Sequence, residues 1–114
     1  MKNIMKFFGI LLLVISFIAC SEEPPSFRVK NDFTNKANVQ IKTTANTENI
    51  NDVEPGTVTA YEDVAEGRVE VTAEIQNVVD EPTGIFNAEP DKNYTVVITN
   101  ANPPAIRIDV SDKW

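Results

Sequence analysis

The sequence offers few side chains that could carry out covalent or metal chemistry. It contains one cysteine, Cys20, and no histidine. Histidine is the commonest general base and a frequent metal ligand, so its absence removes the usual starting point for both kinds of site. Cys20 follows directly on an apolar run from Phe7 to Ala19, with Lys2 and Lys6 ahead of that run. The Cys20 thiol is therefore our one candidate for a covalent modification.

The segment before Cys20 has the features of an export signal. The run from Phe7 to Ala19 has 13 residues, whereas a helix needs about 20 apolar residues to cross a bilayer. A basic start, a short apolar stretch and a small residue before the cut are typical of a secretory signal peptide. We therefore expect residues 1–19 to be a signal that is removed. The alternatives are a short anchor helix and a plain secreted protein with a leftover cysteine.

The residues around Cys20 resemble the lipobox of bacterial lipoproteins, with Phe17 where that family usually has Leu. The resemblance implies that the Cys20 thiol is lipidated, with palmitate among the acyl chains, and becomes the mature N-terminus. A single acyl chain binds a protein to a membrane only marginally, whereas two or three acyl chains attach it permanently. We expect a bacterial cell-envelope protein, lipid-anchored and facing the periplasm or the surface from the outer membrane.

A short polar stretch follows the cysteine. Ser21-Glu22-Glu23 resembles the surface-export signal of Bacteroidetes-type lipoproteins, and the alternative is a solvated linker. Pro24-Pro25-Ser26 favours an extended spacer of about 3.1 Å per residue, which would lift a domain off the membrane. We therefore assign residues 20–26 to the lipidated cysteine and a linker.

Composition limits what the remaining residues can do. Removal of residues 1–19 leaves 95 residues, enough for one small domain. The loss of Lys2 and Lys6 changes the net charge from −7 to −9. A surface this acidic repels phosphate backbones, so we expect no nucleic-acid partner.

From Phe27 onward, apolar and polar residues alternate with the period of half-buried strands. Turn residues separate the strands: Glu54-Pro55-Gly56-Thr57 fits a type II turn, and Glu89-Pro90-Asp91-Lys92 is a type I candidate. Residues 43–53 are polar and poor in β-formers, so they are expected to form a surface loop. The predicted strands are 27–33, 37–42, 57–61, 68–76, 85–88, 93–99 and 105–110. The spacing predicts an all-β fold: an immunoglobulin-like antiparallel β-sandwich of about seven strands over residues 27–114.

Several stretches resemble a family of bacterial envelope lipoproteins that carry an immunoglobulin-like domain of unknown function. They are R-V-K-N at 28–31, V-T-A-Y-E-D-V-A-E-G at 58–67 with V-E-V at 69–71, and D-K-N-Y-T-V-V at 91–97. Asp91 stands where the family usually has glycine. The resemblance covers residues 27–110 and implies a surface or periplasmic lipoprotein domain without assigned chemistry.

The remaining candidate sites have plain structural alternatives. Acidic residues gather in turns, but without the spacing of a calcium loop, so we expect no metal and no cofactor. No pair of carboxylates is placed for hydrolysis by the pattern, so we expect no enzyme. Tyr61 and Trp114 could contact a sugar ring, although tyrosines in a small sandwich more often pack in the core.

The sequence favours a non-catalytic binding or accessory module of adhesion type. Its expected contacts are the membrane, through the lipid on Cys20, and a protein or glycan reached through loops or an exposed sheet edge. One alternative is a carbohydrate-binding lipoprotein of a glycan-uptake system. A second is a small hydrolase or an enzyme inhibitor.

Overall fold

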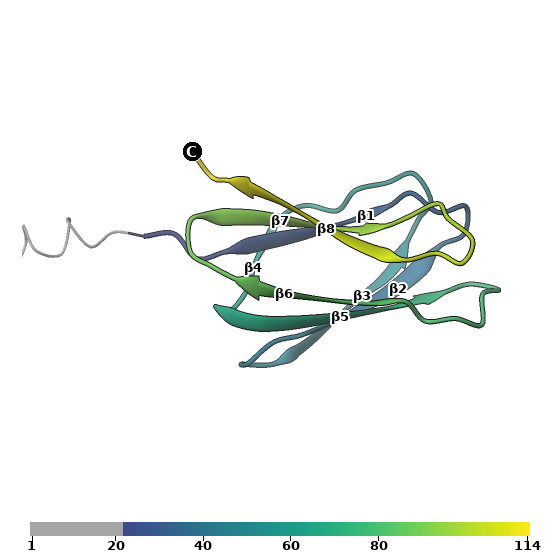
Figure 1. Ribbon diagram of the computed structural model, residues 1–114, viewed down its shortest axis with the longest axis horizontal. Coiled ribbons are helices and arrows are strands. Elements are labelled where there is room, and N and C mark those ends of the chain that lie inside the picture. Colours follow the sequence, from purple (N-terminus) through teal and green to yellow (C-terminus); the bar gives the residue numbers. More distant parts are fainter. Residues whose placement is uncertain (1–21) are drawn as a thin grey trace, which may run out of the picture.

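The computed structural model describes residues 22–114, which form two facing four-stranded sheets (Figure 1). Cys20, Ser21 and the expected signal lie outside the described residues. None of the described residues belongs to a helix with the length and apolarity that a membrane crossing needs. The strands are β1 (Ser26–Asn31), β2 (Ala37–Lys42), β3 (Thr47–Val53), β4 (Glu62–Asp63), β5 (Gly67–Ile75), β6 (Thr83–Ala88), β7 (Lys92–Ile98) and β8 (Ile106–Asp112).

One sheet has the order β4-β1-β7-β8 and the other β3-β2-β5-β6. The prediction of an all-β, immunoglobulin-like sandwich is confirmed, with eight strands in the described residues in place of about seven. The pairs are antiparallel except β1 with β7, which run parallel from Ser26 opposite Asn93 to Asn31 opposite Ile98. Parallel strands cannot be joined by a tight hairpin, so β1 and β7 are neighbours in the sheet while lying far apart in the sequence. Their pairing ties the first strand of the domain to the penultimate one.

The alternation seen in the sequence builds the core. On β5, Val69, Val71, Ala73 and Ile75 point inward and are at most 2% exposed. Burial of such side chains stabilises the fold by about 1.5–3 kcal/mol each for valine and isoleucine. β7 is buried on both faces, since Val96 and Ile98 enter the core while Val97, on the opposite face, is also 0% exposed. β7 is therefore an inner strand of its sheet, with β1 on one side and β8 on the other.

Two strand assignments were wrong. Residues 43–53, expected as a loop, contain β3, in which partly buried Ile50 packs against the core between exposed Asn49 and Asn51. Tertiary packing of that one isoleucine and of buried Val53 outweighs the low β-propensity of the asparagines. Residues 57–61, expected as a strand, run along the edge of β1 but form only one isolated antiparallel bridge, Val58 opposite Lys30. The Thr59 N–H donates to the Val29 carbonyl at 2.9 Å beside it.

Two further local predictions need correction. Pro25 is buried and Ser26 already belongs to β1, so Pro24-Pro25-Ser26 is not a free spacer. Asp91 has φ of 64°, whereas the third position of a type I turn has φ near about −90°. The positive φ explains why a glycine would suit this position. The 54–57 turn agrees with its prediction, with Gly56 at φ of 76°.

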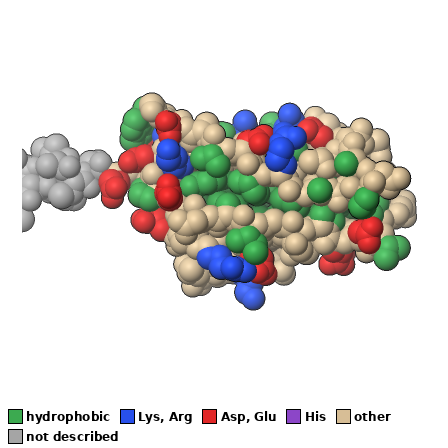
Figure 2. All heavy atoms as spheres, viewed as in Figure 1, with side chains coloured by type: hydrophobic (Ala, Val, Ile, Leu, Met, Phe, Trp, Pro, Cys, Tyr) green, Lys and Arg blue, Asp and Glu red, His purple; other side chains and the backbone are tan. Residues whose placement is uncertain are grey.

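The strand directions place the loops at two ends of the sandwich. The N-terminal end holds residues 22–25, 43–46, 64–66, 89–91 and 113–114, and the opposite end holds residues 32–36, 54–57, 76–82 and 99–105. Figure 1 shows the C-terminal residues and the start of the described chain at the same end. An apolar stripe runs between the sheets on the side facing the viewer (Figure 2).

Candidate functional site

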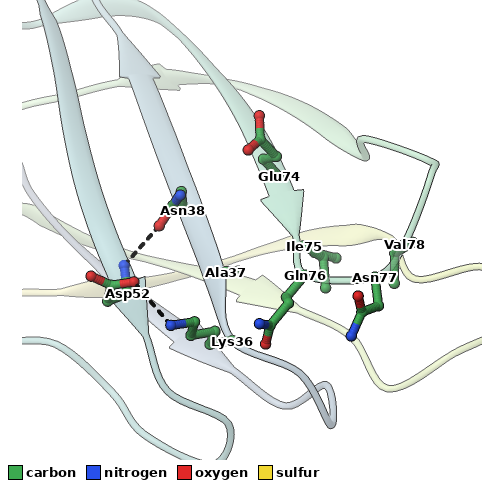
Figure 3. Close-up of a pocket in the computed structure, with 9 residues that line it drawn as sticks. All are labelled: Lys36, Ala37, Asn38, Asp52, Glu74, Ile75, Gln76, Asn77 and Val78. Atoms are coloured by element: carbon green, nitrogen blue, oxygen red, sulfur yellow. Dashed lines mark hydrogen bonds and ion pairs between the residues drawn. The ribbon is translucent and has the colours of Figure 1, made fainter.

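The main hollow in the described residues lies at the opposite end of the sandwich, where β2, β3 and β5 come together (Figure 3). Buried Ala37 and Ile75 contribute its apolar part. Its lining residues are Lys36, Ala37, Asn38, Asp52, Glu74, Ile75, Gln76, Asn77 and Val78. The hollow is open to solvent and has a mixed polar and apolar lining, so it suits recognition of a surface group and not enclosure of a small molecule.

A β-bulge shapes the β3 side of this hollow. The register of β2 against β3 shifts between Ala37, opposite Val53, and Val39, opposite Ile50. Asp52 sits in the bulge at φ of 57°, a left-handed conformation that aspartate tolerates better than most residues. Bulges re-aim side chains and occur often beside binding sites. The bulge brings the Asp52 carboxylate within 3.5 Å of the Lys36 ammonium.

Hydrogen bonds fix the other walls. The Asp52 amide donates to the Asn38 side-chain oxygen at 2.8 Å, as Figure 3 shows. The Gln76 amide donates to the Lys36 carbonyl at 3.0 Å, and the Asn35 side-chain amide donates to the Gln76 carbonyl at 2.8 Å. These bonds hold the loop after β5 against the turn before β2. The amide side chains of Gln76 and Asn77 remain exposed and able to bind.

A second, smaller hollow continues from the first across the outer face of the β3-β2-β5-β6 sheet and shares Asn38 and Glu74 with it. A row of uncharged polar residues crosses this face, because Gln40 pairs with Asn49 on one side and with Thr72 on the other, and Thr72 pairs with Thr83. In a chain with a net charge of −7, this row offers neutral donors and acceptors. Such groups recognise hydroxyls and amides.

The other sheet carries a separate groove that contains Tyr61. The Arg28 guanidinium lies 4.6 Å from the centre of the Tyr61 ring, and its Nε donates to the Thr95 hydroxyl at 3.0 Å. No carboxylate of residues 22–114 lies within ion-pair distance of Arg28. Lys30, Asp109 and Ser111 also line the groove. Arg28 was not predicted as a site residue, although its alternation with the apolar residues Phe27 and Val29 indicated that it faces outward.

The two aromatic candidates are not brought together. Tyr61 is 41% exposed over β1, so the expectation that it packs in the core is wrong. Trp114 is 75% exposed after the end of β8, and the groove that contains Tyr61 does not include it. Tyr94 is the core tyrosine: it is 3% exposed, stacks on Phe86 with ring centres 4.5 Å apart, and its hydroxyl donates to the Asn87 carbonyl.

Two carboxylates, one on β3 and one on β4, lie close together. Burial raises the pKa of Glu48 on β3, and a hydrogen bond and charge repulsion from Glu62 on β4 raise it further. Within residues 22–114, no group of three or more His, Cys, Asp or Glu side chains is arranged to hold a metal ion.

The two described residues of the export-signal candidate lie at the N-terminal end. Glu22 and Glu23 are both exposed. The Glu23 amide donates to the Asp91 carboxylate at 2.9 Å, so the chain is held against the domain directly after this segment. A comparison with protein-family models and with curated proteins found no match to this chain.

Proposed function

We propose that the protein is a lipid-anchored, non-catalytic binding module of the bacterial cell envelope, of the kind that the lipobox and domain resemblances implied. The observation that carries the proposal is the opposed placement of two features. The segment that leads to Cys20 is held at the N-terminal end, and the main hollow lies at the opposite end. A lipid on Cys20 would therefore hold the domain with this hollow turned away from the membrane.

The chemistry of the hollow suits a protein partner. Its rim offers amide groups from Asn77 and Gln76 and one ion pair between Lys36 and Asp52, around buried apolar residues. Polar rims around a smaller apolar centre are characteristic of transient protein interfaces. Val79, next to the hollow in the loop after β5, is 97% exposed and adds an apolar contact.

Site-specific photo-crosslinking on intact cells tests this proposal. A photoreactive residue replaces Asn77, at the hollow, or Ala45, an exposed residue at the N-terminal end. We expect a discrete protein adduct from position 77 and none from position 45. Addition of Gln76→Ala to the first variant should weaken the adduct. Adducts from position 45 alone, or from neither position, would count against the proposal.

A carbohydrate-binding role is the second candidate, favoured by the Arg28–Tyr61 groove. The Arg28 guanidinium has no carboxylate partner among residues 22–114 and is held over an aromatic ring and beside hydroxyls, so it is suited to a sugar that carries a carboxylate. Glycan-array binding that disappears with Tyr61→Ala and with Arg28→Gln would support this role. Trp114→Ala is the matched control, because Trp114 lies outside the groove. Equal binding by all three variants and the unchanged protein would remove this candidate.

A further inference from the structure

Lys113 fixes the last residues of the chain against the segment that leads to Cys20. Its ammonium donates to the Pro24 carbonyl at 2.7 Å and to the Ser26 hydroxyl at 2.8 Å, and lies 3.5 Å from the Glu23 carboxylate. Its backbone amide donates to the Asp91 carbonyl at 3.0 Å. The Lys113 side chain is only 11% exposed, so these contacts form a docked clamp and not a loose surface pair.

The clamp determines where Trp114 lies. Trp114 directly follows the clamped Lys113 along the chain, and 75% of its surface is exposed. Only Ser21 and Glu22 separate Cys20 from Glu23. Because an extended chain spans at most about 3.6 Å per residue, Cys20 lies within about 11 Å of Glu23. A lipid on Cys20 thus brings this end of the domain to the bilayer surface.

An exposed indole at that place has a preferred surrounding. Tryptophan concentrates at membrane–water interfaces, where the ring meets apolar groups and its N–H stays hydrated. Acidic side chains gather at the same end, at the left edge of the described atoms in Figure 2. Among them, Glu23 pairs with Lys113 and Asp112 with Lys92. The mixed and partly acidic surroundings suit zwitterionic headgroups better than a strongly anionic surface.

We propose that Trp114 inserts into the headgroup region of the bilayer that holds the acyl chains of Cys20. The lipid on Cys20 and the Trp114 indole, which the Lys113 clamp positions, then give the domain two membrane contacts at the same end. These contacts hold the long axis of the sandwich away from the membrane plane. The hollow lined by Lys36, Asp52 and Asn77 consequently faces outward in one orientation. This inference rests on the proposed lipid anchor and adds a second, non-covalent membrane contact to it.

The chain contains one tryptophan, so intrinsic fluorescence reports on Trp114 alone. The protein is purified with its own anchor and reconstituted into phosphatidylcholine vesicles, with or without brominated acyl chains. We expect emission at shorter wavelength than for Cys20→Ser in buffer, and strong quenching by the brominated lipid. Emission and quenching equal to those of Cys20→Ser mixed with the same vesicles would overturn the inference.

Relocation of the only tryptophan to the opposite end of the domain tests how the domain is oriented on the membrane. In the background of Trp114→Phe, Val79→Trp places the only indole at the opposite end, at a position that is 97% exposed. We expect this variant to remain anchored and to escape quenching. Quenching as strong as that of Trp114 would show a domain that lies flat or tumbles, and would contradict the upright arrangement.

The mass of the N-terminal peptide distinguishes a failure of the Trp114 contact from a failure of the proposed lipid anchor. A peptide that begins at Cys20 and carries acyl chains, together with an unquenched Trp114, would reject the indole contact and leave the anchor in place. An unmodified Cys20 would reject the anchor, and the inference with it.

Discussion

Glu23 and Asp91 hold each other through two hydrogen bonds across 68 residues of sequence. The Glu23 amide donates to the Asp91 carboxylate, and the Asp91 amide donates to the Glu23 carbonyl, both at 2.9 Å. This reciprocal pair docks the chain that follows the proposed anchor onto the turn between β6 and β7. Under the proposed lipid anchor, this docked segment would fix the orientation of the domain relative to the membrane.

Asp91 should be sensitive to the choice of substitution. Asp91→Ala loses the side-chain acceptor and keeps a φ of 64°, which is unfavourable by about 1–2 kcal/mol for a residue with a Cβ. We expect Asp91→Ala to lower the free energy of unfolding by about 2 kcal/mol. Asp91→Asn keeps an acceptor and tolerates this φ, so it should stay close to the unchanged protein. Urea unfolding and amide exchange at Glu23 measure both effects, and equal behaviour of the two variants would contradict the role given to Asp91.

Asn31 should be the polar residue whose loss damages the fold most. It is 0% exposed, and its side-chain amide donates to the Val53 and Asn35 carbonyls, each at 2.9 Å. Its oxygen accepts the Phe33 amide at 3.0 Å. We expect Asn31→Ala to destabilise by about 2–4 kcal/mol, because each buried group left without a partner costs about 1–3 kcal/mol.

Asn35→Ala is the matched control for Asn31. It removes one exposed bond to the Gln76 carbonyl, so the expected loss is about 0.5–1.5 kcal/mol. Denaturant unfolding of both variants compares them directly. Equal losses would show that the buried network around Asn31 contributes nothing beyond a surface bond.

Gly84 allows β6 and β8 to approach across the open side of the sandwich. A Cβ at this position would lie 2.5 Å from the Ile106 Cγ2. We expect Gly84→Ala to destabilise by about 1–3 kcal/mol through overpacking. The double variant with Ile106→Ala should lose less than the sum of the single variants, since the clashing methyl is gone. If the stability losses of the two single variants simply add in thermal unfolding, the destabilisation by Gly84→Ala does not come from a clash with Ile106.

The Glu48–Glu62 pair predicts a pH dependence with a definite sign. Burial and the neighbouring carboxyl raise the pKa of Glu48 above its ordinary value of 4.5. The folded state therefore holds the proton more tightly than the unfolded chain, and stability falls as pH rises from 4.5 through the raised pKa. Glu48→Gln should be the more stable protein near neutral pH, by less than about 1 kcal/mol because the site is partly solvated.

Below pH 4.5 the advantage of Glu48→Gln should vanish. Glu62→Gln should give a similar gain near neutral pH, and the double variant should gain no more than either single one, since both relieve the same repulsion. A gain that is equally large at low pH would contradict this reading.

Where alternation is strong, the sequence was sufficient to predict the fold. β5 reads as a strand because Val69, Val71 and Ala73 alternate with charged or polar residues. β3 was missed because only Ile50 and Val53 mark its inward face, and its bulge breaks the period between them. The parallel pairing of β1 with β7 depends on contacts far apart in sequence, which no local pattern encodes.

The candidate sites were predictable only in part. Tyr61 was chosen from the sequence and does line a groove, but Arg28, whose guanidinium lies over the Tyr61 ring, was identified only from that contact at 4.6 Å. The hollow around Lys36 and Asp52 arises from a bulge and two loops that meet in space. Composition does not show which loops come together in space. The alternation Asn49-Ile50-Asn51, by contrast, indicates a strand with a polar outer face, which is the face next to this hollow.

The most direct test of the lipid-anchored arrangement is the chemical state of Cys20 in cells. Labelled palmitate should enter the unchanged protein and not Cys20→Ser, and the mature chain should begin at the acylated Cys20. A mature chain that retains Met1, or equal labelling of the two proteins, would contradict the anchor and the outward-facing orientation that depends on it.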